Sequence, residues 1–465
     1  MAEFNGILID IFEQRASFGG VWNYSDYPVG TIDIPQMNAD QPLEKPIWHS
    51  DGIKDDLTNR EPYTSFDSPM YEQLETNIPH CLMKYSDAPS LESHQLFPSR
   101  QVVTQYLEDY AEDIRRLVMF QTQITDIRPY SPDTKTGWVV QFKSLKSNEA
   151  CERLYDAVVV ANGHYTVPTL PEIKGISEWD QANKGIISHS KFYRRPEPFT
   201  KKKVIIVGNS ASGVDIASQI ATVCKHPVLN SSRSDSPLTY KANYKKPLPE
   251  IIEFLPPTQG TRAVLFANGR MEDNIDAILF CTGYFYSFPF LSSISPKLIS
   301  TGERVQHLYK HLLYIPNPNL AFVGLPCKIT PFRTFEGQAA AIARVWSGRL
   351  KLPSKLEMCQ WEEDVIAERG TGKPFHVLPF PRDIEYHNDM VAWATSAQGR
   401  PGRVPPKWTA KETWLRERLP AIKKAFADKG EERHTIKTVE ELGFDYDAWL
   451  KEKGLSKEHV NGLIQ

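Results

Sequence analysis

The chain has 465 residues, of which 41% are apolar and 24% are charged, as in water-soluble globular proteins with two or three packed cores. A formal net charge of −3 without a basic stripe argues against a nucleic-acid partner. No run approaches the ~20 apolar residues that cross a bilayer, and the N-terminus lacks the features of a secretory signal. Six cysteines without a C-x-x-C pair or even spacing argue against a metal site and indicate reduced thiols, so a cytoplasmic protein is expected.

The first predicted element is a short strand from Gly6 to Glu13, followed by Phe18-Gly19-Gly20-Val21-Trp22. An acid that closes a strand binds the adenosine ribose in a Rossmann unit, where it ends the second strand. The first strand and its glycine turn are then expected about 20 to 30 residues upstream, and the printed sequence holds no such segment. The alternative is that Glu13 is a surface carboxylate.

The next part of the chain alternates between loop and regular structure. Residues 23–67 are rich in Pro, Asp and aromatic residues and predict a long loop. Helical spacing resumes over 68–77, and an amphipathic helix is predicted from Gln101 to about Leu117. Strands are expected at 123–127, 138–142 and 155–160, the last of them buried and followed by Asn162-Gly163.

The segment from Lys203 to Gly213 predicts a nucleotide-binding turn. Val204 to Val207 indicates a fully covered strand, and Gly208 allows the tight turn that aims the free N–H groups of the next helix at a pyrophosphate. Gly213 allows close packing of that helix, expected over 214–220. Because Ser210 replaces the usual middle glycine, the fingerprint is Gly-x-Ser-x-x-Gly, and both Ser210 and Ser212 are assigned to the cofactor. An ordinary glycine loop is the alternative.

The strand that follows this turn indicates which dinucleotide binds. Residues 226–233 predict that strand and its exit, where Ser231 and Arg233 offer a hydroxyl and a guanidinium. A free ribose 2′-OH is usually bound by an acid about 20 residues after the turn, whereas a 2′-phosphate is bound by Arg. No acid occurs there before Asp235, so NADPH is favoured over NADH. The alternative is that Arg233 is a solvated loop residue.

The second nucleotide unit extends from about 166 to 285 and closes on a strand at 275–284 that ends in Thr282-Gly283. The two strands ending at Asn162-Gly163 and Thr282-Gly283 are interpreted as paired crossing points between two domains. The chain then returns through residues 320–324 to a helix from Glu336 to Trp346, and a polar helical tail begins at 351.

Taken together, these strings resemble the flavin-containing monooxygenases, in their fungal form, without the N-terminal FAD glycine motif. The identifying sequence of that family, F-x-G-x-x-x-H-x-x-x-Y/F, matches Asn183-x-Gly185-x-x-x-His189-x-x-x-Tyr193, with only the leading aromatic replaced. Three further family motifs match Gly19-Gly20-Val21-Trp22, Thr76-Asn77 and Cys281-Thr282-Gly283-Tyr284.

The resemblance implies an α/β fold with two Rossmann-like dinucleotide-binding domains. An NADPH domain at 166–285 would be inserted into a discontinuous FAD-type domain, made of 1–165 and of 286–465 with its helical tail. Two consecutive independent domains are the alternative, and the pairing of the strands at 155–163 and 275–284 distinguishes the two arrangements.

The chemistry implied by the resemblance relies on the two cofactors. NADPH reduces FAD, the reduced flavin takes up dioxygen as a C4a-hydroperoxide, and a small soft nucleophile, sulfur or nitrogen, attacks the outer oxygen. Asn77 would face the flavin and steady the peroxide, with a turn residue as the alternative. His189 and Tyr193 are interpreted as parts of a structural linker. The cofactor sites would be completed by Glu13, Gly19, Gly20, Trp22, Thr76, Thr282 and Gly283.

Two alternative functions stay open at this stage. Baeyer–Villiger oxygenation of ketones uses the same cofactors. Without the first strand and glycine turn, flavin binding would be weak or absent, which would leave a non-catalytic NADPH-binding protein. The sequence indicates neither the substrate nor the oligomeric state.

Overall fold

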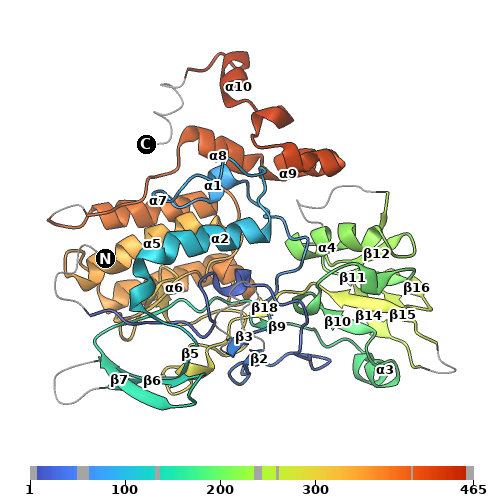
Figure 1. Cartoon of the computed structure of the whole chain (residues 1–465), viewed down its shortest axis with the longest axis horizontal. Coiled ribbons are helices and arrows are strands. Elements are labelled where there is room, and N and C mark those ends of the chain that lie inside the picture. The colour runs from blue at the N-terminus through green and yellow to red at the C-terminus, as the bar shows by residue number, and fades with distance from the viewer. Residues whose placement is uncertain are drawn as a thin grey trace. The chain divides into compact units, whose positions relative to one another are not determined.

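The computed structural model describes residues 8–49, 62–130, 137–234, 243–257, 261–399 and 402–456. The chain forms two compact units, each assembled from segments that are distant in the sequence (Figure 1). Unit 1 contains Met1–Gly19, Glu75–Gly163 and Phe288–Gln465, and unit 2 contains Gly20–Leu74 and His164–Ser287. The start of the predicted first strand at Gly6 and the acid Asp235 lie outside the described residues.

The segment Gly20–Leu74 lies in unit 2, whereas the sequence places it in the FAD-type part. Its hydrogen bonds explain this difference. The backbone of Gln36 exchanges two bonds with Leu170, at 2.9 and 3.0 Å. Glu44 accepts a bond from Lys191 at 2.8 Å. Such long-range contacts leave no periodic signal in a loop. The other unit boundaries, at Gly163 and Ser287, lie beside the predicted positions of 165 and 285.

Unit 2 is built on a five-stranded parallel sheet in the order β10-β17-β11-β12-β13. The central strand β11 is covered on both faces, and Val204, Ile205 and Ile206 are each 0% exposed. This burial explains its uninterrupted apolar run. The predicted strand in a parallel sheet and the helix after it, α4, are confirmed. The bounds are β10 (Ile187–His189), β11 (Val204–Val207), β12 (Val228–Ser231), β13 (Lys245–Leu248), β17 (Ala277–Phe280) and α4 (Ala211–Ala221).

The predicted pairing of the strands at 155–163 and 275–284 is wrong, because Val158–Val160 pairs within unit 1 and Ala277–Phe280 pairs within the parallel sheet of unit 2. The two short segments at which the chain enters and leaves unit 2 pair with each other instead. Strand β9 runs antiparallel to β18, with Pro168 opposite Tyr284, and the N–H of Thr169 donates to the carbonyl of Gly283 at 2.9 Å. An inserted domain requires this closeness. The other elements of unit 2 are β2 (Ile47–His49), β3 (Tyr63–Ser65), β9 (Val167–Pro168), β14 (Ile251–Phe254), β15 (Val264–Phe266), β16 (Met271–Glu272), β18 (Tyr284–Phe285), α3 (Ile176–Ala182) and the 3-10 turns η1 (Gly20–Trp22), η3 (Ser190–Phe192) and η4 (Glu197–Phe199).

The helical spacing at 68–77 does not produce a helix, so that prediction is wrong. Hydrogen bonds to other segments of unit 2 hold the first part of this stretch in place. The Ser68 hydroxyl donates to the carbonyl of Val21, and the N–H of Glu72 donates to the carbonyl of Arg194 at 2.9 Å. These bonds take the place of the i to i−4 bonds that a helix would need.

Unit 1 contains three sheets among its described residues. No described strand joins β1 to β8, and Val159 in the middle of β8 is 45% exposed. The prediction of one buried strand over 155–160 is wrong, because Tyr155 ends an antiparallel sheet and the chain turns before Val158 pairs with Leu320. The sheets are the parallel pair β1 (Ile11–Phe12) and β4 (Val118–Met119); β5 (Thr122–Tyr130), β6 (Gly137–Ser144) and β7 (Ala150–Tyr155); and β19 (Leu308–Tyr309), β20 (Leu313–Tyr314), β21 (Leu320–Phe322) and β8 (Val158–Val160).

Helices supply most of the rest of unit 1. The predicted helix from Gln101 is confirmed as α2, whose last predicted residues form the 3-10 turn η2. Helices α5 and α7 pack closely, since a Cβ atom at Gly337 would lie 3.2 Å from the Cβ atom of Met390. The helical elements are α1 (His80–Met83), α2 (Arg100–Ala111), α5 (Pro331–Trp346), α6 (Lys355–Arg369), α7 (Arg382–Thr395), α8 (Ala410–Glu417), α9 (Leu419–Asp428), α10 (Tyr446–Glu452), η2 (Glu112–Leu117), η6 (Pro289–Leu291), η7 (Lys373–His376), η8 (Gly430–Thr435) and η9 (Glu440–Leu442).

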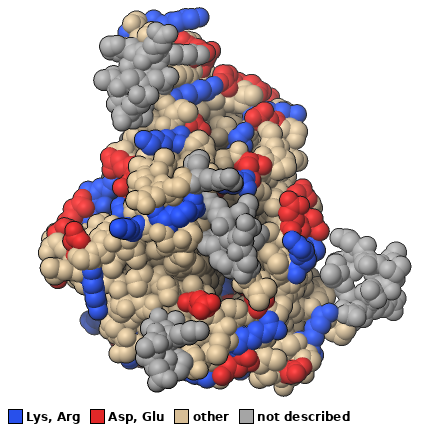
Figure 2. Space-filling view, turned by 90° about the vertical axis from the view of Figure 1, so that its left-hand side faces the viewer, with Lys and Arg blue, Asp and Glu red and all other residues tan. Residues whose placement is uncertain are grey.

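No helix among the described residues combines the length and the apolar character needed to cross a bilayer. On the face of the molecule that Figure 2 shows, Lys and Arg side chains are interspersed with Asp and Glu and with wide uncharged areas.

Candidate functional site

The turn after β11 requires glycine at two positions. Gly208 has a φ of +113°, and a Cβ atom there would lie 2.6 Å from the carbonyl oxygen of Cys281. A Cβ atom at Gly213 would lie 2.3 Å from the carbonyl oxygen of Gly208. Both glycines therefore allow α4 to approach the end of the sheet closely, as a pyrophosphate-binding turn requires.

The N-terminus of α4 is open to a ligand. Ser210 is the N-cap residue in an extended conformation, and its side chain makes no capping hydrogen bond. Ser210 and Ser212 are both exposed. Because the first N–H groups of a helix have no partner within the helix, they can donate to phosphate oxygens. The turn thus has the geometry of a pyrophosphate-binding turn, with Ser210 at the usual glycine position.

The two residues predicted to recognise the adenosine ribose differ in their placement. Ser231 is 0% exposed and its hydroxyl donates to the carbonyl of Pro249 at 2.9 Å, which fixes the end of β12. Arg233 has a side chain that is 79% exposed, with its Nε atom 2.9 Å from Glu250. Sequence reasoning missed Glu250, because only the folded chain brings it next to Arg233.

Thr282 and Gly283 lie at the paired crossing point of unit 2. The Thr282 hydroxyl donates to the carbonyl of Thr169, and Gly283 has a φ of +82° that only glycine adopts without strain. Both residues therefore stabilise the point at which the chain leaves unit 2.

The motif residues His189 and Tyr193 are buried parts of the framework. His189 ends β10, is 0% exposed and accepts the N–H of Lys191 on its Nδ1 atom at 3.0 Å. The Tyr193 hydroxyl donates to Gln219 on α4 at 3.0 Å. The packing of both side chains supports the interpretation of this stretch as structural, and Ile187–His189 form the strand β10.

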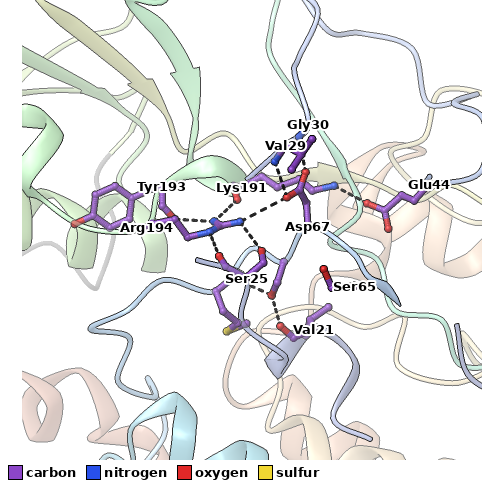
Figure 3. Close-up of polar contacts among 12 residues, drawn as sticks. Val21, Ser25, Val29, Gly30, Glu44, Ser65, Asp67, Lys191, Tyr193 and Arg194 are labelled. Atoms are coloured by element: carbon purple, nitrogen blue, oxygen red, sulfur yellow. Dashed lines mark hydrogen bonds and ion pairs between the residues drawn. The ribbon is translucent and has the colours of Figure 1, made fainter. Parts of the chain in front are cut away.

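A buried cation that the sequence reasoning missed follows this motif directly. The guanidinium of Arg194, a residue only 5% exposed, donates to the carbonyls of Lys191 and Tyr193 at 2.9 Å and of Ser25 at 2.5 Å (Figure 3). Its Nη2 atom lies 4.0 Å from Asp67. Burial lowers the pKa of Arg194, and the Asp67 carboxylate opposes that shift.

Lys191 and Asp67 extend this network to the loop segments of unit 2. The Lys191 ammonium donates to Glu44 at 2.8 Å and to the carbonyl of Thr166 at 2.6 Å. Asp67 accepts the N–H of Gly30 at 2.7 Å (Figure 3). The network thus anchors the aperiodic segment Gly20–Leu74 to the strands around the nucleotide turn.

A second buried polar network contacts α4 itself. The hydroxyl of Tyr71 donates to the carboxylate of Asp215, which also accepts from the Nε2 atom of Gln219 at 3.1 Å. Burial, reinforced by the Asp215 charge, raises the pKa of Tyr71 far above its usual value. The tyrosine therefore stays protonated and donates permanently to Asp215.

In unit 1, Glu13 follows β1 as predicted. Its carboxylate accepts the N–H of Arg15 at 2.7 Å, and its own N–H donates to the carbonyl of Met119 at 3.1 Å. Burial raises the pKa of Glu13, and the bond from Arg15 opposes the shift. A partly exposed carboxylate at a strand end fits a ribose hydroxyl.

The motif Gly19-Gly20-Val21-Trp22 spans the boundary between the units. Gly19 ends the first segment of unit 1, whereas Gly20 and Trp22 form η1 in unit 2. Gly19 and Gly20 both have positive φ angles, of 95° and 51°.

Thr76 and Asn77 are neighbours with opposite environments in unit 1. Thr76 is 4% exposed, and its hydroxyl donates to the carbonyl of Ile78 at 2.8 Å. Asn77 is exposed, and its side chain makes no hydrogen bond to the described residues. The amide of Asn77 is therefore the group of this pair that can meet a ligand.

The comparison with protein families decides the family. The sequence model of the family described as flavin-binding monooxygenase-like matches residues 63–249 and 257–373. The chain belongs to the flavin-containing monooxygenase family. This match covers both the nucleotide turn of unit 2 and the α5 and α6 region of unit 1. The chain is thus a flavin-dependent monooxygenase by descent, as the resemblance of its motifs predicted.

Individual relatives agree with this assignment. The flavin-containing monooxygenase FMO GS-OX-like 2 of Arabidopsis thaliana is 34% identical over 401 residues, which cover 82% of this chain and 79% of the relative. FMO GS-OX1 of the same plant is 34% identical over 396 residues, covering 81% and 75%.

Solved structures show the same mixed α/β fold. S-allyl-L-cysteine S-oxygenase from Allium sativum superposes with a TM-score of 0.72 at 27% identity, covering 96% of this chain and 92% of that one. Tmm from Pelagibacter gives a TM-score of 0.66 at 22% identity, covering 91% and 85%, which supports the fold alone. The flavin-containing monooxygenase fold with two Rossmann-type domains is therefore confirmed.

Among the residues that the structure describes, no group of three or more His, Cys, Asp or Glu side chains is arranged to hold a metal ion. The described part of unit 1 also shows no second glycine turn like that at Gly208 to Gly213. Its groups that fit FAD are Glu13 for a ribose hydroxyl and the unengaged amide of Asn77.

Proposed function

We propose that the chain is an NADPH- and FAD-dependent monooxygenase that transfers one oxygen atom of dioxygen to a small soft nucleophile. The open helix N-terminus between Gly208 and Gly213 carries this proposal, because it fits a dinucleotide pyrophosphate in a chain of this family. FAD, when bound, supplies the oxygen-activating chemistry, with NADPH as the source of electrons.

The residues of the chain would position and shield the reacting groups. The first turn of α4 binds the NADPH pyrophosphate, and Arg233 binds the 2′-phosphate through charge-assisted hydrogen bonds. Glu13 accepts a hydroxyl of the FAD ribose. The side chain of Asn77 donates a hydrogen bond toward the flavin, where negative charge develops during the reaction.

Sulfur is the preferred nucleophile in this proposal. The support comes from the Allium sativum protein, which is named as an S-oxygenase of S-allyl-L-cysteine and aligns with 96% of this chain. We therefore propose small thioethers as the substrate class. Tertiary amines are the second class of nucleophile against which thioethers are tested.

The test is NADPH oxidation by the purified chain in the presence of FAD, oxygen and S-allyl-L-cysteine. We expect substrate-dependent NADPH oxidation and a sulfoxide product heavier than the substrate by one oxygen atom. Labelled dioxygen should supply that atom. A tertiary amine in place of the thioether shows whether nitrogen is also oxidised.

Three results would contradict the proposal. The first is NADPH binding without uptake of FAD, which indicates a non-catalytic nucleotide-binding protein. The second is conversion of a ketone to an ester with no oxidation of thioethers or amines, which indicates Baeyer–Villiger oxygenation. The third is NADPH oxidation that yields no oxygenated product with any of these substrates.

A further inference from the structure

Two parts of unit 1 that are distant in the sequence share one apolar core. Leu82 and Phe97 are buried against Ile422 and Phe426 of α9, and the rings of the two phenylalanines lie 4.8 Å apart. Helices α8 to α10 form a C-terminal tail (410–452), and Figure 1 shows α1 beside α8. The C-terminal tail therefore packs on the segment that follows the Thr-Asn pair.

Lys423 on α9 connects the C-terminal tail to the peptide bond between Thr76 and Asn77. Its ammonium donates to the carbonyl of Thr76 at 2.8 Å. The same ammonium lies 4.3 Å from the centre of the Phe97 ring and 5.5 Å from that of the Phe426 ring. Both rings are fully buried, and their π electrons attract the cation. These contacts restrict the direction in which Lys423 donates.

The bond from Lys423 fixes the backbone at Asn77. A peptide unit is planar, so a carbonyl oxygen held in one direction also fixes the N–H group and the Cα atom of the next residue. On the other side of Asn77, the Thr76 hydroxyl donates to the carbonyl of Ile78 at 2.8 Å. The side chain of Asn77 is exposed and makes no hydrogen bond to the described residues. The backbone is thus restrained, whereas the amide is available to a ligand.

A second cation of the C-terminal tail contacts the residue before the Thr-Asn pair. Arg433 in η8 has its Nε atom 3.3 Å from the carboxylate of Glu75, which also accepts from Nε2 of Gln95 at 3.1 Å. The next N–H, that of Thr76, donates to the carbonyl of Pro98 at 2.9 Å. Arg433 therefore restrains the same short segment from a second point of the tail.

We propose that Lys423, assisted by Arg433, is a positioning residue that holds the amide of Asn77 in place for its contact with the flavin. This inference rests on the proposed function, in which that amide donates toward developing negative charge. Neither cation is a catalytic residue here, because each acts through residues 75–77. Positioning matters because a displacement of about 1 Å can remove most of the effect of a catalytic group.

Hydrogen–deuterium exchange on the chain without added cofactors tests the restraint itself. Lys423→Met keeps an apolar side chain over the Phe97 ring and removes the ammonium. We expect residues 75–78 to exchange about tenfold faster, because a hydrogen bond from a charged group is lost. The matched control is Lys424→Met, since Lys424 is the next residue of α9 and pairs with Asp428 at the surface. Equal exchange rates in the two variants would overturn the proposal.

The yield of oxygenated product per NADPH oxidised tests the link to the reaction. This ratio does not depend on the fraction of folded protein, so a loss of stability alone leaves it unchanged. We expect the yield to fall about tenfold in Lys423→Met and to keep the wild-type value in Lys424→Met. KM for NADPH should be unchanged, because the nucleotide turn is left intact. A wild-type yield in Lys423→Met would overturn the proposal.

A double-mutant cycle shows whether Lys423 acts through Asn77. Once the amide is absent its position no longer matters, so Lys423→Met should lower the yield no further in an Asn77→Ala background. A further tenfold loss would show an independent effect of Lys423 and refute the positioning role. A wild type that forms no oxygenated product would contradict the proposed function and this role together, whereas additive losses in an active protein contradict this role alone.

Arg433→Met covers the case in which Lys423→Met does not fold. Arg433 is partly exposed, and Gln95 still binds Glu75 in this variant. We therefore expect a smaller fall in yield, about threefold, which should again be absent in an Asn77→Ala background. An unchanged yield in Arg433→Met, together with unchanged exchange of residues 75–78, would overturn the proposal.

Discussion

A Cβ atom at Gly213 would lie 2.3 Å from the carbonyl oxygen of Gly208, which is closer than any real Cβ contact. The carbonyl belongs to the backbone of the nucleotide turn and cannot move without changing the direction in which α4 leaves the sheet. We therefore expect Gly213→Ala to destabilise the protein by about 1–3 kcal/mol and to weaken NADPH binding. Thermal unfolding and nucleotide titration measure the two effects.

The neighbouring Ser212 provides the control for this substitution. It is exposed and on the same helical turn, so Ser212→Ala should change the free energy of unfolding by less than about 0.5 kcal/mol. An unchanged unfolding temperature in Gly213→Ala would contradict the close packing of α4 on β11.

Arg233 is expected to distinguish NADPH from NADH. Arg233→Gln removes a contact that only the 2′-phosphate makes, so NADPH binding should weaken by about 1.5 kcal/mol, roughly tenfold, while NADH binding stays the same. Glu250→Gln removes the acid 2.9 Å from Arg233 and should leave NADPH binding unchanged or tighter. Equal losses for both nucleotides in Arg233→Gln would assign the phosphate contact to another cation.

The buried tyrosines around α4 should differ in their contribution to stability. Tyr71 donates to the Asp215 carboxylate, whereas Tyr193 donates to the neutral amide of Gln219. We expect Tyr71→Phe to cost about 1.5–3 kcal/mol and Tyr193→Phe about 1 kcal/mol, because bonds to charged groups contribute more. Chemical denaturation of both variants measures the order, and a reversed order would mean that Asp215 is satisfied by other donors.

Substitution of Asn77 should affect how much oxygenated product forms per NADPH oxidised, and not the stability of the protein. Its exposed amide makes no bond to the described residues, so Asn77→Ala should unfold at the wild-type temperature. If this amide stabilises developing charge at the flavin, the yield of oxygenated product per NADPH should fall about a hundredfold. Thr76→Ala provides the contrast, because the Thr76 hydroxyl is buried and its loss should lower stability by about 1 kcal/mol.

The stability of the protein should depend on pH through His311. Burial, with smaller contributions from Arg369 and Lys310, lowers its pKa to about 3 from a usual value of 6.5. Between these values the unfolded chain binds a proton that the folded chain does not, so stability is complete above about pH 6.5 and falls as the pH decreases. From pH 7 to pH 5 the loss from this one group is about 2 kcal/mol.

The variant His311→Asn should lose less stability than the wild type over the same pH range. Asn tolerates the left-handed backbone of residue 311, which has a φ of 54°. Identical slopes for the two proteins would contradict the lowered pKa of His311 in the folded state.

Local sequence patterns were enough to predict the position of the nucleotide-binding turn and to identify the family. The apolar run Val204 to Val207, with Gly208 and Gly213 at their spacing, specifies a buried parallel strand and a closely packed helix, because these requirements are steric and lie within ten consecutive residues. The motif from Gly185 to Tyr193 identified the family without any structure. The amphipathic helix that begins near residue 101 could also be predicted from the sequence, because the residues of its buried face repeat at the helical period.

Only the tertiary structure decided the contacts between distant segments. Residues 68–74 have helical spacing but are held by bonds to Val21, Arg194 and Asp215 that no local pattern encodes. Three other features depend on distant partners in the same way. They are the burial of Arg194, the hydrogen bond from the Ser231 hydroxyl to the carbonyl of Pro249, and the ion pair between Arg233 and Glu250. Such contacts join residues 17 to 169 positions apart, and their free energy arises only when folding brings both partners out of water together.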